Sequence, residues 1–473
     1  MSFTSLSFYL FFAAACALYF CVPARLRRYA LLAADAAFYC FLGARFALTL
    51  CAVILLSWLC GLWIGAARQK KAALAVSLCA VFAALVCLKY LRFAAGLFGA
   101  GDLFASLAAP LGLSFYTLTC AGYLIDVYRG DRAPERDFVR YALFVGLFLQ
   151  ILSGPIPRSK ALLPQFDEPK SFDFGRFRSG ALRAGFGLFV KLVVADNLNA
   201  AVNSIYAVYA DADGLRLITA TVLYGFAIYC DFRAYTDIVL GCGEILGFTL
   251  PENFRAPYLS RSVREFWRRW HMSLSTWFRD YLYFPLGGSR CTKARAWFNT
   301  LVVFAASGLW HGASLNFLVW GLLHGCYLVC GDMTAGLRGR ARKTLRIKDN
   351  GFYDKFILPL FVFLLVDFAW IFFRAPGLGA AVTILHRFRL LPEAAVLRYL
   401  LSTMGITGAR MAAALAGLAV VFGVDVLTRR EIPVREKYFA LPAAARWAGY
   451  YAMALTALFL GAFTGSSFIY YGF

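Results

Sequence analysis

The chain has 473 residues, of which 61% are hydrophobic and 16% are charged, with a mean hydropathy of +0.66. A soluble domain carries about 25% charged residues, so this composition excludes an ordinary soluble protein and indicates a membrane protein. The net charge of +22 does not favour nucleic acid as a partner, because the basic residues lie between apolar runs and not on one face. That placement is typical of topology signals and of contacts with membrane lipids.

Apolar runs recur from end to end of the chain, and a spanning helix needs roughly 20 apolar residues. We therefore predict an all-α polytopic membrane protein with roughly 11–13 transmembrane or re-entrant helices, plus interfacial amphipathic helices. The first run, Met1 to Cys21, lacks a positive leader and a cleavage site and is expected to be a retained span. The runs lie at 4–22, 30–44, 46–66, 72–91, 103–127, 138–156, 181–206, 216–242, 298–313, 315–332, 356–373, 408–427 and 446–464.

The connections between these runs alternate in charge. Three of the early ones are basic, while the connections between them are short or nearly uncharged. The positive-inside rule then places the N-terminus outside and the basic connections in the cytoplasm. The basic residues of these three connections are Arg25, Arg27 and Arg28; Arg68, Lys70 and Lys71; and Arg129, Arg132 and Arg136.

Residues 251–290 break the pattern, since they hold too many charges to span a membrane and too many aromatic residues for an ordinary loop. A capping box, Ser262 to Glu265, predicts a helix start. Aromatic residues then recur at helical spacing, while Arg264, Arg268, His271 and Arg279 share another face. This predicts one helix on the membrane surface, ending before Pro285. An anchoring helix without chemistry explains the same pattern.

His311 lies between the runs 298–313 and 315–332, both bracketed by basic segments. A hairpin that enters and leaves on one side would carry this histidine deep into the membrane, where ionisable groups usually mark a pathway or a reaction centre. The flanking Gly308 and Gly312 would allow a close approach by another backbone or a ligand. A buried packing histidine, a general base for acyl transfer and a proton-coupled transporter all fit these residues.

The other histidines carry less information. His271 lies among arginines, where it could help to bind an anionic donor or simply face lipid headgroups. His324 is interpreted as a packing or capping residue, and His386 receives no role. Metal-binding patterns such as His-x-x-x-His, His-Glu-x-x-His and Cys-x-x-Cys are absent from the sequence, so we predict neither a metal nor a bound cofactor.

Two long motifs resemble the membrane-bound O-acyltransferase family, especially its alginate O-acetyltransferase branch. The first is Phe266-Trp-Arg-Arg-Trp-His271, continuing to Pro285-Leu-Gly-Gly-Ser289, and the second is Gly308-Leu-Trp-His311-Gly-Ala-Ser-Leu-Asn316. Shorter matches include Pro251-Glu-Asn-Phe254 and the aromatic ending Phe468 to Phe473. Departures such as Leu315 near His311, Arg233-Ala234 after Asp231, Thr119, Gly122 and Gly472 leave the acceptor in question.

The resemblance implies one transmembrane domain over residues 1–473, with an interfacial motif region at 251–297 and a catalytic hairpin at 298–332. It also implies His311 as the catalytic base and His271 as a secondary catalytic residue. The expected substrate-binding residues are Trp310, Asn316, Arg264, Arg268, Arg279 and Asp280.

The resemblance places the protein in the cytoplasmic membrane of a bacterium, and the implied reaction moves an acyl group, usually acetyl, from a cytoplasmic thioester to the outer side. The donor would be acetyl-CoA or an acyl carrier thioester. The acceptor would be an exported polysaccharide or an extracytoplasmic acetyltransferase- or esterase-like partner protein. Three alternatives stay open: D-alanyl transfer to teichoic acid, a non-enzymatic acyl conduit that serves a partner enzyme, and an adaptor for an export complex.

Overall fold

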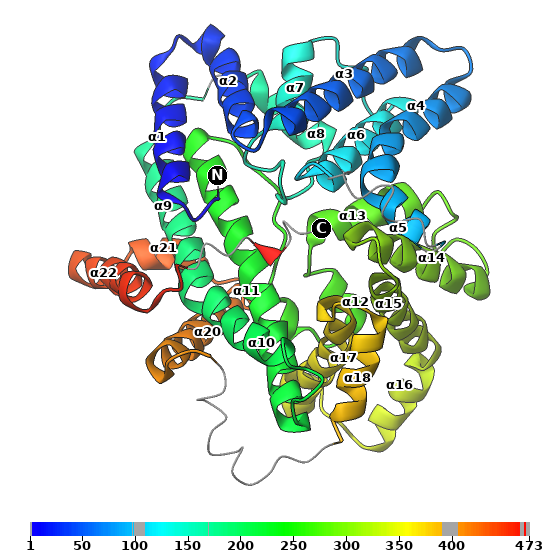
Figure 1. Ribbon diagram of the computed structural model, residues 1–473, viewed down its shortest axis with the longest axis vertical. Coiled ribbons are helices and arrows are strands. Elements are labelled where there is room, and N and C mark those ends of the chain that lie inside the picture. Colours follow the sequence, from blue (N-terminus) through cyan, green and yellow to red (C-terminus); the bar gives the residue numbers. More distant parts are fainter. Residues whose placement is uncertain are drawn as a thin grey trace. The chain divides into compact units, whose positions relative to one another are not determined.

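The computed structural model describes residues 2–96, 98, 109–168, 170–389, 405–463 and 468–469, and within these ranges the regular elements are helices without any strand (Figure 1). The prediction of an all-α fold is confirmed. Its helices are α1 (Leu6–Cys21), α2 (Arg27–Cys40), α3 (Ala44–Ala66), α4 (Lys70–Leu85), α5 (Leu91–Gly96), α6 (Leu113–Tyr128), α7 (Phe138–Gly146), α8 (Ser159–Leu162), α9 (Phe174–Phe189), α10 (Asp196–Tyr206), α11 (Gly214–Leu246), α12 (Val263–Trp267), α13 (Met272–Phe278), α14 (Lys293–His311), α15 (Leu315–Met333), α16 (Ala335–Thr344), α17 (Leu358–Arg374), α18 (Leu378–Arg387), α20 (Gly408–Arg429), α21 (Val434–Phe439) and α22 (Ala443–Leu460).

Seven helices in the described part of the chain are long and apolar enough to cross a membrane. Large apolar side chains stay exposed on them, for example Leu48 and Trp63 on α3 and Leu360 on α17. Lipid tails would cover such side chains, and helices satisfy their own backbone hydrogen bonds, so the chain is a multi-pass membrane protein. The seven span Ala44–Ala66, Lys70–Tyr90, Phe174–Tyr206, Gly214–Leu246, Leu315–Met333, Tyr353–Arg374 and Gly408–Arg429.

Side-chain caps set several helix starts, because the first N–H groups of a helix lack partners within it. The Asp137 carboxylate accepts hydrogen bonds from the backbone N–H groups of Val139 (2.9 Å) and Arg140 (3.2 Å) at the start of α7. The Ser262 hydroxyl accepts from the backbone N–H of Glu265 (3.1 Å) at the start of α12, which confirms the helix start predicted there.

Two predicted elements are wrong. The apolar run 138–156 is not one helix, since α7 ends at Gly146 and the buried residues 147–153 form turns. The surface helix predicted between 262 and Pro285 is interrupted, because His271 adopts a left-handed backbone conformation (φ 43°, ψ 53°) between α12 and α13. Aromatic residues recur in α12 and in α13, but these are two separate helices and not one continuous helix.

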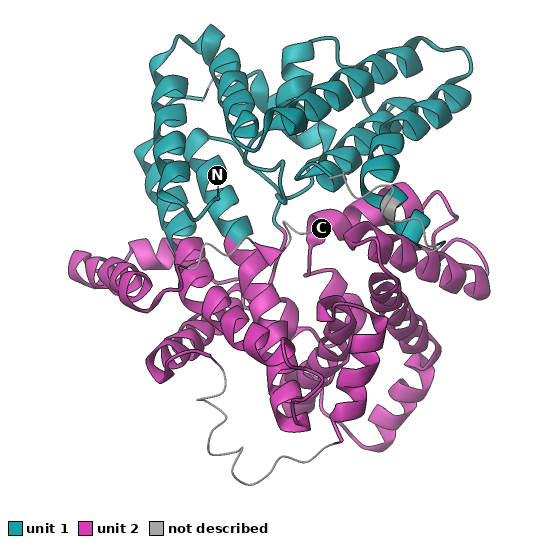
Figure 2. Ribbon diagram, in the orientation of Figure 1, with its two compact units in different colours: residues 1–185, 235–252, 470–473 teal, residues 186–234, 253–469 magenta. Residues whose placement is uncertain are grey.

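The described chain forms two compact units (Figure 2). Of the described residues, the first contains those up to 185 together with 235–252, and the second contains 186–234 and those from 253 to 469. Helices α9 and α11 each contribute residues to both units. Residues 470–473 of the aromatic ending and residues 103–108 of a predicted apolar run lie outside the described residues.

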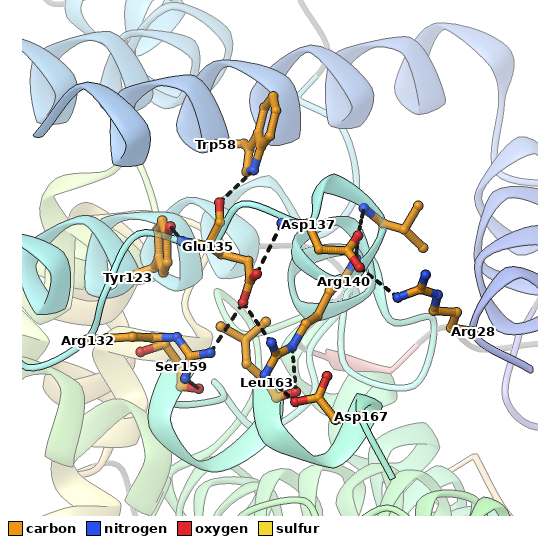
Figure 3. A network of polar contacts seen from close by, with 11 residues as sticks. Arg28, Trp58, Tyr123, Arg132, Glu135, Asp137, Arg140, Ser159, Leu163 and Asp167 are labelled. Carbon is orange, nitrogen blue, oxygen red and sulfur yellow. Dashed lines mark hydrogen bonds and ion pairs between the residues drawn. The ribbon is translucent and has the colours of Figure 1, made fainter. Parts of the chain in front are cut away.

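A polar network in the first unit joins connections that the charge pattern places in the cytoplasm (Figure 3). The buried Glu135 carboxylate pairs with Arg132 and Arg140, both at 3.3 Å, and the Trp58 indole donates to the Glu135 carbonyl oxygen at 2.9 Å. Arg28 pairs with Asp137 at 2.7 Å. The network therefore joins the start of α2, the middle of α3 and the connection after α6.

In the second unit, α14 and α15 form an antiparallel hairpin through residues 312–314, and glycines permit their close approach. A Cβ atom on Gly308 would lie 2.3 Å from the carbonyl oxygen of Phe317, and one on Gly321 would lie 2.2 Å from that of Phe304. Both distances are far below van der Waals contact. This confirms the close backbone approach predicted at Gly308.

We predict that Gly321→Ala separates α14 from α15 and lowers the free energy of unfolding by about 1–3 kcal/mol, as overpacking usually does. Gly336→Ala on α16 is the matched control, because its Cβ would meet no atom within 4 Å. The control should leave the apparent melting temperature of the detergent-purified protein unchanged or slightly raised. Equal melting temperatures for both variants would contradict the close packing.

Candidate functional site in the second compact unit

His311 is the last residue of α14 and is 1% exposed. Its ring lies 4.9 Å from the ring of Trp310, 4.8 Å from that of Trp320 and 5.6 Å from that of Phe373, measured between ring centres. The hairpin thus carries an imidazole into an aromatic cage built from α14, α15 and α17. A polar ring in such surroundings needs a hydrogen-bond partner.

The partner is the backbone carbonyl of Ser307, one turn earlier in α14, at 2.7 Å from Nδ1 of His311. A carbonyl oxygen only accepts, so Nδ1 carries the proton and donates. In the neutral ring the lone pair is then on Nε2. This fixed tautomer is the one that a general base acting through Nε2 requires.

His271 lies next to His311, with 6.5 Å between the two ring centres. It is fully buried, and the Phe232 ring of α11 packs edge-on against it at 4.8 Å. Nδ1 of His271 lies 3.4 Å from Oδ1 of Asn253, which also accepts a 2.6 Å hydrogen bond from the Ser273 hydroxyl. A remote segment therefore holds this second imidazole in place.

The backbone around His271 explains its direction. Residues 253–255 pair with the segment before α13, since Met272 N–H donates to the Asn253 carbonyl and Arg255 N–H donates to the Arg269 carbonyl, both at 3.0 Å. The left-handed conformation of His271, unusual for a residue with a side chain, turns the imidazole inward. The neighbouring arginines of the motif stay outside.

Burial lowers the pKa of His271 well below its ordinary value, and the nearby His311 acts in the same direction. Two close imidazoles cannot both be protonated cheaply in a desolvated site. His271 is therefore neutral at physiological pH. A proton arriving at this pair would therefore bind to His311, while His271 stays neutral beside it.

The predicted substrate-binding residues separate into two groups. Trp310 is buried between the histidines, 4.9 Å from the His311 ring and 6.2 Å from the His271 ring. Asn316 is also buried, but its amide donates to the carbonyl oxygens of Phe372 and Ala375, both at 3.0 Å. Asn316 therefore ties the start of α15 to the end of α17, and its proposed contact with substrate stays a prediction.

The charged members of the predicted set lie outside the buried cluster. The side chains of Arg264, Arg268 and Arg279 are exposed, and that of Asp280 is half-buried. Arg264 pairs with Asp332 at 3.6 Å, and Arg279 pairs with its neighbour Asp280 at 2.7 Å. The common face predicted for His271 and these arginines is wrong, because the break at His271 sends the imidazole and the guanidinium groups in different directions.

His324 fits its interpretation as a packing residue. It is fully buried, accepts a hydrogen bond from the Trp267 indole at 3.3 Å and contacts Trp320 at 5.2 Å between ring centres. Trp320 in turn contacts His311, so α15 supports the site from one side.

Sequence reasoning missed Asn253, Phe232, Trp320 and Phe373 as neighbours of the two histidines. Asn253 stood inside a recognised motif, Pro251 to Phe254, but no spacing rule connects it with residue 271. The aromatic neighbours come from α11, α15 and α17, and only the three-dimensional packing brings them together. To identify these neighbours from the sequence, one would need information on which distant positions contact each other.

A second buried polar cluster lies on α11 and on the segment between α9 and α10. Lys191 is fully buried and its ammonium group lies 2.7 Å from both Asp196 and Asp231. The other oxygen of Asp231 accepts a 2.8 Å hydrogen bond from the backbone N–H of Ile469. This cluster attaches the end of the described chain to α11, and a charged residue within the apolar run 181–206 was its sequence signal.

Comparisons with known proteins identify the family of the chain. Residues 135–364, which contain both histidines, match the family model described as MBOAT, membrane-bound O-acyltransferase family. The chain is 36% identical over 382 residues to a probable alginate O-acetylase of Azotobacter vinelandii, a match that covers 77% of this chain and 73% of the relative. The chain therefore belongs to the membrane-bound O-acyltransferase family, and it is an O-acyltransferase.

The names of two further relatives indicate other polymers as their acceptors. The chain is 34% identical to a peptidoglycan O-acetyltransferase of Helicobacter pylori, over 59% of this chain and 56% of that protein. It is 28% identical to a teichoic acid D-alanyltransferase of Bacillus subtilis, over 48% of this chain and 59% of that protein.

We predict that His271→Asn flattens the dependence of stability on pH. The lowered pKa means that below pH 6.5 the unfolded chain binds a proton at His271 that the folded chain does not, so folding loses up to about 1.4 kcal/mol per pH unit. Asparagine tolerates the left-handed conformation. Apparent melting temperatures at pH 7.5 and 5.5 should fall less in the variant than in the wild type; equal falls would refute this contribution.

Proposed function

We propose that the protein transfers an acetyl group from a thioester donor on the cytoplasmic side to hydroxyl groups of an exported or cell-surface polysaccharide. The observation that carries this proposal is the buried pair His311 and His271, with Nδ1 of His311 bonded to a carbonyl oxygen. The acceptor class is supported by the polymers that the names of the relatives give, alginate and peptidoglycan.

In the proposed chemistry, Nε2 of His311 removes the proton of the attacking hydroxyl while its oxygen bonds to the thioester carbonyl carbon. The tetrahedral intermediate then collapses, the carbon–sulfur bond breaks and the thiolate leaves. The proton held by His311 passes to the thiolate, so the products are an ester and a thiol. The Ser307 carbonyl supports this step, since its bond to Nδ1–H strengthens as the ring becomes positive.

His271 has a positioning role in this proposal. It lies beside Trp310 and His311, and it is held by Asn253, which in turn accepts a hydrogen bond from Ser273. A neutral imidazole there can orient a reacting group by hydrogen bonding without competing for the proton. The donor would be acetyl-CoA or an acyl carrier thioester, and the polysaccharide would be reached directly or through an extracytoplasmic acetyltransferase- or esterase-like partner.

D-alanyl transfer to teichoic acid is the alternative, and a weaker match supports it than supports acetyl transfer. The match to the D-alanyltransferase covers 48% of this chain, against 77% for the alginate O-acetylase. Cells fed with labelled acetate and labelled D-alanine distinguish the two, because only the transferred group appears as a base-labile ester on the purified surface polymer.

We predict that His311→Ala reduces acetyl transfer to surface polymer by about 10²–10⁴-fold, the usual contribution of a general base. His386→Ala is the matched control, since its side chain is exposed on α18. The assay follows labelled acetyl groups onto isolated polymer, with the amount of each variant in the membrane measured in parallel.

Normal acetyl transfer by a well-expressed His311→Ala variant would show that His311 is not the general base. The conduit alternative makes a different prediction, because transfer would then depend on a partner enzyme even in reconstituted vesicles. Thioester cleavage by the purified chain with a small hydroxyl acceptor, lost in His311→Ala, would exclude it.

A further inference from the structure

An open cavity of about 360 Å³ lies within the first compact unit, whereas His271 and His311 belong to the second unit. Three arginines at and just before the start of α2 line it, Arg25, Arg27 and Arg28, together with the aromatic residues Tyr19, Phe166 and Phe248. We call it the arginine pocket. Its volume is within the range of small-molecule sites, which begins at about 300 Å³.

The acidic residues of the arginine pocket are already paired with other cations. Asp167 pairs with Arg140 at 2.6 Å, and Glu168 pairs with Lys170 at 2.5 Å. Arg28 is likewise paired with Asp137 at 2.7 Å. The carboxylates of the lining are therefore already neutralised by these cations, and none of them pairs with Arg25 or Arg27.

Arg25 and Arg27 have no carboxylate partner among the described residues. The Arg27 guanidinium donates to two neutral groups, the carbonyl oxygens of Lys170 (2.6 Å) and Val22 (3.4 Å). These bonds fix its position but leave its charge uncompensated. Arg25 is exposed at the mouth. A preoriented guanidinium beside a second one is the arrangement that binds a phosphate group through paired N–H donors.

The polar network of Figure 3 makes this wall rigid. Arg140 links Asp167 to the buried Glu135 and also donates to the carbonyl oxygen of Leu163 at 3.2 Å. Arg28 is anchored to the start of α7 through Asp137. A pocket whose walls are held before binding loses little entropy when a ligand arrives.

We propose that the arginine pocket binds the phosphate group of an anionic amphiphile, with Arg25 and Arg27 on the phosphate and Tyr19, Phe166 and Phe248 against its apolar or flat part. Two sources share this chemistry: an anionic phospholipid headgroup and the nucleotide part of a coenzyme-type donor. Basic pockets between helices on the cytoplasmic side are known to take phosphate headgroups, and the charge pattern places this connection there. The proposal does not depend on the identity of the acetyl acceptor.

The test measures binding of two probes to the purified full-length chain in nanodiscs of neutral phosphatidylcholine. Adenosine 3′,5′-bisphosphate represents the nucleotide source, and short-chain phosphatidylglycerol represents the lipid source. The double variant Arg25→Gln with Arg27→Gln should weaken binding of the preferred probe at least tenfold. The matched control, Arg340→Gln with Arg430→Gln, removes two exposed arginines elsewhere and should bind like the wild type.

Loss of bisphosphate binding alone in the Arg25/Arg27 variant supports the nucleotide source, and loss of phosphatidylglycerol binding alone supports the lipid source. Should the double variant unfold, Arg25→Gln alone serves, because this exposed side chain supports no neighbour and its removal should still weaken binding. The proposal is overturned if neither probe saturates on the wild type, or if the control loses as much affinity as the pocket variant.

Discussion

A polar group enclosed by apolar helices must find its hydrogen-bond partner inside the protein, because neither lipid nor bulk water supplies one. His311 meets this requirement with the Ser307 carbonyl of its own helix, and His271 meets it with Asn253. Lys191 does so with two aspartates. Each solution also fixes a direction: the carbonyl determines which nitrogen of His311 is basic, and Asn253 holds the ring of His271 beside it. The chemistry of the site follows from the need to satisfy buried polar atoms.

Close packing of α14 against α15 adds the second condition. The absence of Cβ atoms at Gly308 and Gly321 lets the two backbones touch, so Trp320 of α15 reaches the His311 ring. Phe373 of α17 and Trp310 complete the enclosure. An aromatic cage of this kind excludes water, and in a low-dielectric site each remaining hydrogen bond counts for more. The segment that matches the family model, residues 135–364, contains His311, Trp310 and Trp320.

The sequence was most informative where one physical rule governs a long segment. Apolar length predicted long helices such as α1, α3, α15, α17, α20 and α22 within a few residues, and the glycine spacing in α14 predicted a close approach. It failed where a single backbone conformation decides the outcome. Helical periodicity through residues 262–281 is genuine in α12 and α13, yet the turn at His271 separates the two helices, and His271 itself is buried. Asn253 and Phe232 join the site through contacts across the chain, for which local spacing carries no information.

The two imidazoles differ in how they are anchored. His311 takes its orientation from four residues earlier in the same helix, so that orientation accompanies the hairpin wherever it is transplanted. His271 takes its orientation from Asn253, eighteen positions upstream, and from an unusual backbone turn. The orientation of the first ring therefore needs only the turn of α14 that carries it, whereas that of the second depends on the length of the 253–271 interval. An insertion or deletion within this interval would displace the second ring and leave the bond of the first intact.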